Sequence, residues 1–125
     1  MSYDLDGVEQ LDYAELKEIF DQKKSSPILI DVREPEEYIE RHIPNVPLIP
    51  MQSIPERIEE FHKDAEYIFI CRSGTRSHHV ALYFKDNGIE NVKNFAGGML
   101  AWESETESGW EGQVRDIEGL YSKQT

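Results

Sequence analysis

The chain has 125 residues, of which 38% are hydrophobic and 30% are charged, and its formal net charge is −12. A length of this order suits a single domain that buries one hydrophobic core. The strong negative charge argues against nucleic acid or an anionic membrane surface as the main partner, because both require a positive protein face. A transmembrane helix needs roughly 20 apolar residues, and no stretch of the sequence approaches that length.

Cysteine usage and the first residues point to a compartment. Cys71 is the single cysteine of the chain, so no disulfide can form within it, and an unpaired thiol is typical of a reducing compartment. Residues 1–6 lack the basic region and apolar run of a secretory signal. We therefore expect a cytoplasmic protein. Its domain is expected at residues 1–110, followed by a polar, loosely held tail at residues 111–125.

The first half of the chain alternates helical and strand patterns. Asp12 and Glu15 have the spacing of a capping box, which predicts a helix from residue 12 that ends at residues 25–27. Residues 28–32 form a short and nearly all-apolar run, which is typical of a strand buried on both faces of a parallel sheet. A proline suited to the first turn of a helix then predicts a short helix beginning at residues 34–38.

The second half continues the alternation. Strands are predicted at residues 48–49, 67–70 and 92–95, and helices at residues 53–62, 75–87 and 99–103. Strands that alternate with helices predict a three-layer α/β domain. We expect a central, mainly parallel sheet of about five strands with helices on both faces.

The strand at residues 67–70 leads directly into the most informative segment. Cys71 follows that strand, and a short loop with Gly74 connects it to the next helix. Ligands of open α/β sheets bind beyond the carboxyl ends of the strands. The free N–H groups of the loop, the positive end of the helix and the charges of Arg72 and Arg76 all favour a thiolate, the nucleophilic form of cysteine.

The distribution of charge supports this interpretation. Residues 67–85 contain no acidic side chain but include Arg72, Arg76 and Lys85, so one positive segment surrounds the cysteine of an acidic chain. Such a segment can draw a small anion toward a cleft. The alternative is a buried structural cysteine, but burying two arginines around an inert thiol would be costly.

Three motifs in the chain resemble those of the rhodanese family. The active-site loop of that family corresponds to Cys-Arg-Ser-Gly-Thr-Arg-Ser at residues 71–77. The upstream motif corresponds to Asp-Val-Arg-Glu-Pro-Glu-Glu-Tyr at residues 31–38, followed by His-Ile-Pro at residues 42–44, and the downstream motif to Asn-Phe-Ala-Gly-Gly-Met-Leu-Ala-Trp at residues 94–102. The resemblance runs over residues 8–102, most of the chain, and three motifs in the family's order make it specific.

The resemblance implies a sulfurtransferase with a rhodanese-like three-layer domain. It implies that Cys71 carries sulfur as a persulfide, received from a small anion such as thiosulfate and passed to cyanide or to a thiol, including a protein thiol. It implies no metal and no organic cofactor. The residues whose backbone amides would form the anion cradle are Arg72, Ser73, Gly74, Thr75, Arg76 and Ser77. Asp31 and Arg33 would support the site, although an ordinary strand end that enters a helix cap explains them equally well.

The chain departs from the family pattern at two positions. Arg41 and Asn45 replace the glycines that usually flank the His-Ile-Pro motif. Asparagine tolerates a left-handed backbone better than most residues, so Asn45 is expected to keep the turn. Arg41 does so less easily, so we expect a different loop shape and an added positive charge near the mouth of the site.

Two other functions remain open. Phosphatases and arsenate reductases of a similar fold have one more residue between their cysteine and arginine than the four between Cys71 and Arg76, so a phosphoryl group would be cramped here. A sulfur-relay or binding module that receives persulfide from one protein and passes it to another is supported by the acidic surface.

A zinc site is not expected, because adjacent helix residues such as His78 and His79 point about 100° apart. Both side chains are expected to be partly exposed.

Overall fold

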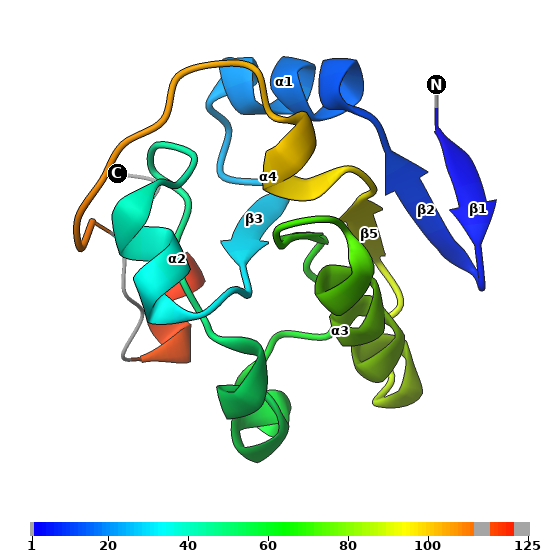
Figure 1. The fold of residues 1–125 in the computed structure, drawn as a ribbon. Coiled ribbons are helices and arrows are strands. Elements are labelled where there is room, and N and C mark those ends of the chain that lie inside the picture. Colours follow the sequence, from blue (N-terminus) through cyan, green and yellow to red (C-terminus); the bar gives the residue numbers. More distant parts are fainter. Residues whose placement is uncertain (1, 112–115, 122–125) are drawn as a thin grey trace.

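The computed structural model describes residues 2–111 and 116–121, which form one twisted sheet with helices packed against both faces (Figure 1). The order of strands across the sheet is β1-β2-β5-β4-β3. β1 pairs antiparallel with β2, and the other neighbouring strands are parallel. The strands are β1 (Tyr3–Leu5), β2 (Val8–Leu11), β3 (Ile28–Asp31), β4 (Tyr67–Ile70) and β5 (Val92–Phe95). The predicted α/β class with a five-stranded, mainly parallel sheet is confirmed.

Helices cover the two faces of the sheet with separate hydrophobic clusters. The α-helices are α1 (Tyr13–Gln22), α2 (Pro35–Glu40), α3 (Thr75–Asp86) and α4 (Gly98–Ala101), and the 3₁₀ segments are η1 (Met51–Ser53), η2 (Pro55–Glu60) and η3 (Ile117–Tyr121). One cluster includes Phe84 of α3, and the other includes Leu16 of α1 and Met99 of α4. No helix within residues 2–111 and 116–121 has the length and apolar character that a membrane crossing requires.

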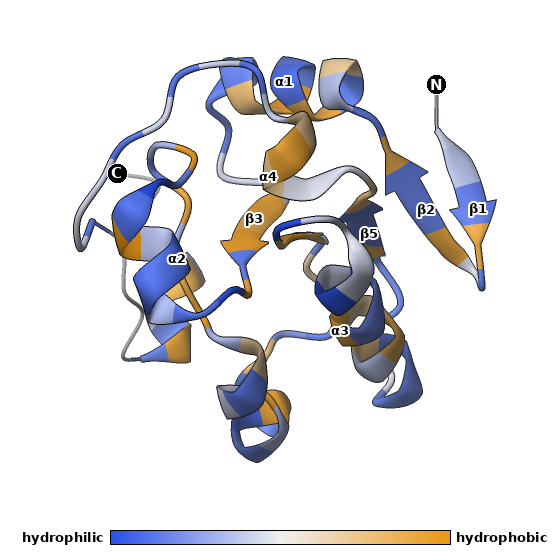
Figure 2. Ribbon diagram, viewed as in Figure 1, coloured by the Kyte–Doolittle hydropathy of each residue, from blue (hydrophilic) through white to orange (hydrophobic). Residues whose placement is uncertain are grey.

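Strand β4 shows why the centre of the sheet reads as an unbroken apolar run. Tyr67 and Phe69 belong to the α3 side of the core, whereas Ile68 and Ile70 belong to the α1 side, and all four side chains are fully buried. Hydropathy mapped on the ribbon shows the same pattern for β3, which is hydrophobic along most of its length (Figure 2). Because successive side chains of a strand point to opposite faces, a strand covered on both sides has no polar face.

The strands of the sheet differ from the predicted ones at two places, the N-terminal hairpin and residues 48–49. The capping box of Asp12 and Glu15 at the start of α1 is confirmed, but β1 and β2 before it were not predicted. The predicted strand at residues 48–49 is wrong: Leu48 forms only an isolated bridge to Asp31. Proline residues 47 and 50 flank this pair, and proline has no N–H to continue a ladder.

The helix predicted over residues 53–62 is instead two 3₁₀ segments. Their backbone bonds span three residues, as from Ile54 N–H to the carbonyl of Met51 at 3.2 Å and from Arg57 N–H to that of Ile54 at 2.9 Å. Pro55 has no N–H, so an α-helix that continued from η1 would lack the bond from residue 55 to the Met51 carbonyl. The Ser53 hydroxyl donates back to the Pro50 carbonyl at 2.8 Å rather than capping a helix.

The described part of the C-terminal tail packs into the core, contrary to expectation. Ile117 and Leu120 of η3 are 0% and 3% exposed. The hydroxyl of Tyr121 accepts a hydrogen bond from His62 N–H at 3.0 Å and lies 2.5 Å from the Tyr67 hydroxyl. The sequence signal was the helical spacing of these three apolar residues. The rest of the tail lies outside the described residues.

Truncating this anchor is expected to destabilise the fold. The Leu120→Ala variant should lower the free energy of unfolding by about 2–4 kcal/mol, because a buried leucine loses its contacts and leaves a cavity. Urea unfolding followed by circular dichroism measures this difference. The matched control is Leu100→Ala, whose side chain is 63% exposed and whose effect should stay within about 0.5 kcal/mol. Equal stability of Leu120→Ala and wild type would contradict the role of η3.

Candidate active site

Cys71 lies directly beyond β4, and its sulfur faces the first turn of α3. The Sγ atom accepts hydrogen bonds from the Gly74 N–H at 3.1 Å, the Ser77 N–H at 3.3 Å and the Ser77 hydroxyl at 3.2 Å. The residue is only 1% exposed. Three donors that converge on one sulfur form a cradle for negative charge, because an anion is a stronger hydrogen-bond acceptor than a neutral group.

The loop can turn this tightly because residue 74 is a glycine. Gly74 has a φ of +96°, and a Cβ built there would lie 1.9 Å from the carbonyl oxygen of Ala96. The loop is also held by the start of α4. The N–H groups of Met99 and Leu100 donate to the carbonyls of Cys71 and Arg72 at 2.8 and 3.0 Å. The downstream motif therefore fixes the backbone of the active-site loop.

The two loop arginines have different surroundings. Arg76 donates from both terminal nitrogens to the two carboxylate oxygens of Glu37 at 2.9 Å each. The hydrogen bonds from Arg76 lower the pKa of Glu37 to about 2, and Glu37 in turn raises the pKa of Arg76. Arg72 is exposed and forms no ion pair with a described residue. The sequence did not single out Glu37, although it lies in the upstream motif.

The Glu37–Arg76 pair predicts a pH effect on stability. The folded pKa of Glu37, about 2, is below the ordinary glutamate value of 4.5, so the pair stabilises the protein above pH 4.5 and loses this contribution as the pH falls toward 2. The stability difference between wild type and Glu37→Gln should therefore be largest near pH 5 and shrink toward pH 3. Both side chains are about a third exposed, which limits the difference to about 1 kcal/mol. Thermal unfolding at several pH values checks it, and a difference that grows on acidification would contradict it.

Asp31 and Arg33 form a buried ion pair that supports the neighbouring loop. They are 1% and 5% exposed, and Arg33 donates from Nε and Nη2 to the Asp31 carboxylate at 2.8–3.0 Å. The same Nη2 donates to the carbonyl of Arg41 at 2.6 Å. No hydrogen bond described in residues 2–111 and 116–121 joins either side chain to Cys71. Their hydrogen bonds join the two side chains to each other and to the backbone at Arg41.

The two departures from the family pattern are accommodated differently. Asn45 has a φ of 68°, so the left-handed turn that was expected there is confirmed. Arg41 has a φ of −168°, an extended backbone that any residue adopts, so a glycine is not required at this position. Its Nη2 atom lies 3.4 Å from the carbonyl of Met99. Beside the active-site loop is a pocket of about 390 Å³ lined by Arg33, Glu37, Glu40, Arg41, Arg72, Met99 and Leu100.

His42, His62 and His78 form side-chain hydrogen bonds. His78 was expected to be partly exposed but is only 9% exposed, and it bonds to Gln10 and Asp6, whereas His79 is exposed. Among the described residues, His42, Glu107 and Glu111 bring three potential metal-ligand atoms within 4.8 Å. Within this group His42 and Glu111 already pair at 2.6 Å, which accounts for their proximity without an ion.

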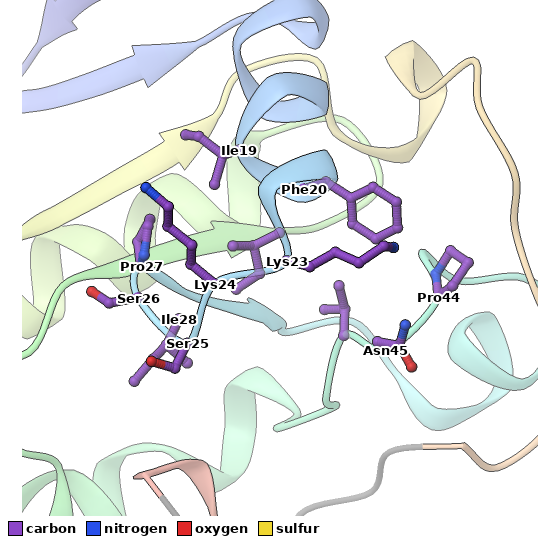
Figure 3. A pocket seen from close by; sticks show the side chains of 12 residues that line it. Ile19, Phe20, Lys23, Lys24, Ser25, Ser26, Pro27, Ile28, Pro44 and Asn45 are labelled. Carbon is purple, nitrogen blue, oxygen red and sulfur yellow. The ribbon is translucent and has the colours of Figure 1, made fainter. Parts of the chain in front are cut away.

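A second pocket, of about 250 Å³, lies away from Cys71 (Figure 3). The end of α1, the start of β3 and the turn at residues 44–46 form its walls, with the side chains of Phe20, Lys23, Lys24 and Ile28 around it. Cys71 follows the carboxyl end of β4, whereas this pocket adjoins the amino end of the parallel strand β3. Its lining contains lysine and serine side chains but no cysteine.

Comparison with known proteins agrees with the geometry. A model of the rhodanese-like domain matches residues 12–105. The protein YtwF of Bacillus subtilis, whose name includes the word sulfurtransferase, is 46% identical over 99 residues, which cover 79% of this chain and 94% of YtwF. The thiosulfate sulfurtransferase GlpE of Pseudoalteromonas translucida is 31% identical over 81 residues, covering 65% of this chain and 77% of GlpE.

A solved structure gives the same result for the fold. The rhodanese-like domain protein of Staphylococcus aureus superposes with a TM-score of 0.69 and 39% sequence identity, covering 79% of this chain and 96% of that protein. The matched residues include β3, β4, α3 and β5, and therefore the Cys71 loop and its neighbours. The chain belongs to the rhodanese-like domain family.

Proposed function

We propose that the protein transfers sulfane sulfur from a donor such as thiosulfate to a thiol or cyanide acceptor through a persulfide on Cys71. The observation that carries this proposal is the convergence of the Gly74 and Ser77 N–H groups and the Ser77 hydroxyl on the Cys71 sulfur. Sulfurtransferase names among the relatives support the class of reaction, and the GlpE relative is named for thiosulfate.

The reaction has two steps that balance. The Cys71 thiolate attacks the outer sulfur of thiosulfate, a new S–S bond forms, and sulfite leaves with the electron pair of the bond that breaks. An acceptor thiolate then attacks the terminal sulfur, forms its own S–S bond and releases the Cys71 thiolate. The N–H groups of Gly74 and Ser77 would hold the negative charge in both steps, because they already point at the sulfur.

The side chains around the cradle have separate roles in this proposal. Arg72 would attract the sulfur-containing anion, since it is exposed and forms no ion pair with a described residue. Arg76 would hold the loop to α2 through Glu37, and its charge would still favour an anion nearby. Asp31 and Arg33 would keep the loop at Arg41 in place. No residue in these roles requires a metal or an organic cofactor.

Mass spectrometry after thiosulfate treatment tests the first step. The wild-type protein should gain the mass of one sulfur atom, and the gain should disappear on treatment with a reducing thiol. The Cys71→Ala variant should gain nothing, because it has no nucleophile. A folded wild-type protein that gains no sulfur from any donor in a panel of thiosulfate, polysulfide and protein persulfide would overturn the proposal.

A sulfur relay between proteins is the second candidate, favoured by the net charge of −12, which suits docking to a basic protein. Steady-state kinetics with thiosulfate separate the two functions. Saturable turnover supports the enzyme, whereas a stable persulfide with turnover near zero supports the relay. Release of phosphate from an aryl phosphate tests the third candidate, a phosphatase or arsenate reductase, which the short loop between Cys71 and Arg76 disfavours.

A further inference from the structure

Strand β5 buries an amide side chain in the interior, beside the active-site loop. Asn94 is 1% exposed, and its Nδ2 group donates to the carbonyl of Gly74 at 3.0 Å and to the Gln10 side-chain oxygen at 2.8 Å. Its Oδ1 atom is buried and has no hydrogen-bond partner among the described residues. A buried acceptor without a partner destabilises a fold, so the presence of this amide calls for a compensating role.

The amide belongs to a buried chain of hydrogen bonds that crosses from β5 to α3. The Gln10 Nε2 group donates to the Val8 carbonyl at 3.1 Å and lies 3.1 Å from His78 Nδ1. His78 Nε2 lies 2.9 Å from a carboxylate oxygen of Asp6. Because Gln10 donates to His78 Nδ1, the proton of the neutral ring is assigned to Nε2, which donates to Asp6.

The neighbours of Asn94 also fix the direction of its amide. Both atoms that face Nδ2, the Gly74 carbonyl oxygen and the Gln10 Oε1, are acceptors. Turning the amide over would place Oδ1 against two acceptors and lose both hydrogen bonds. Gln10 is held in the same way by the Val8 carbonyl, so donors at these positions are required by the structure around them.

Gly74 is the point where this chain of bonds meets the active site. Its N–H donates to the Cys71 sulfur at 3.1 Å, and its carbonyl accepts from the Asn94 side chain at 3.0 Å and from the His78 N–H at 3.2 Å. The Asn94 bond is made from the sheet, whereas the His78 N–H bond belongs to the first turn of α3. Asn94 therefore fixes the residue that carries one of the three donors to the sulfur.

We propose that Asn94 and Gln10 are positioning residues of the sulfur cradle. Asn94 holds Gly74 so that its N–H stays directed at Cys71, and Gln10 holds Asn94. Neither side chain touches the sulfur. This inference rests on the proposed function only in taking Cys71 as the sulfur-carrying residue. It adds Gln10 of β2 and Asn94 of β5 to the residues that shape the site.

The rate of Cys71 alkylation by iodoacetamide, measured across pH, tests the proposal. The Asn94→Leu variant should react about tenfold more slowly than wild type near neutral pH, because a misdirected Gly74 N–H no longer donates to the Cys71 sulfur. Above about pH 10 the two proteins should react at the same rate, since ionisation then needs no help. The control is Val92→Ala, which truncates a buried side chain two residues earlier on β5 and leaves the Gly74 bonds intact.

The outcomes separate positioning from packing. A structural role alone would lower the melting temperature of Asn94→Leu and Val92→Ala and leave both alkylation profiles unchanged, which would overturn the proposal. Gln10→Leu should slow alkylation by about threefold and decides the question if Asn94→Leu does not fold. Alkylation needs no sulfur donor. A wild-type protein that gains no persulfide therefore counts against the proposed function and leaves this test intact.

Discussion

The Gly74→Ala variant is expected to lose at least about a hundredfold in kcat/KM for sulfur transfer. The added Cβ would lie 1.9 Å from the Ala96 carbonyl oxygen and 2.8 Å from its carbonyl carbon, and both are backbone atoms that cannot turn aside. The loop would have to move away from β5. That movement takes the Gly74 N–H off the Cys71 sulfur and breaks the bond to Asn94.

Persulfide turnover in a cyanide assay, together with thermal unfolding, measures this effect. The matched control is Gly109→Ala, because Gly109 has a similar φ of +93° but no atom within 4 Å of the added Cβ. It should show the cost of the left-handed backbone alone and keep its activity. If both variants lost activity equally, backbone strain rather than the contact at Ala96 would explain Gly74.

The Asp31→Asn variant is expected to lower the free energy of unfolding by about 3–5 kcal/mol. The change leaves the Arg33 guanidinium, 5% exposed, without its charge partner in the interior. It also weakens the hold of Arg33 on the Arg41 carbonyl, so activity should fall together with stability. Urea unfolding gives the energy, and the cyanide assay gives the activity.

Two further variants show whether the loss comes from the unpaired charge. The double variant Asp31→Asn with Arg33→Met should be more stable than Asp31→Asn alone, because it no longer buries an unpaired cation. Asp21→Asn, which breaks the exposed pair with Lys17 on α1, should change stability by less than about 0.5 kcal/mol. A double variant less stable than Asp31→Asn would contradict this account.

The parallel core of the fold could be predicted because its strands carry their own signal. β4 is apolar throughout, and β3 is apolar up to Asp31, because both faces of these strands are covered. β2 was missed because Glu9 and Gln10 make it look polar, although Gln10 is buried in the hydrogen-bond chain to Asn94. η3 was missed because its apolar residues lie in a polar segment and find their partners, such as His62 and Tyr67, only in three dimensions.

Residues of the candidate site that are adjacent in the sequence could be predicted, whereas partners that are distant in the sequence could not. The residues from Cys71 to Ser77 are contiguous, and a strand, a glycine loop and a helix start are enough to predict donors around one sulfur. Glu37 reaches Arg76 across 39 residues of sequence, and Asn94 reaches Gly74 across 20. Such partners follow from the order of strands in the sheet, which local patterns do not determine.

The failed strand at residues 48–49 has a consequence for how molecules of this protein meet one another. β3 is an outer strand of the sheet, where unpaired backbone groups invite a strand from a second molecule. Residues 47–51 cover the carboxyl end of this edge strand. Asp31 N–H donates to the Pro47 carbonyl, and the N–H groups of Ile49 and Met51 donate to the carbonyls of Asp31 and Val32, at 2.9–3.0 Å. The prolines of this segment offer no ladder to extend. The other edge strand, β1, has only three residues, so neither edge of the sheet offers a long strand for pairing with a second molecule.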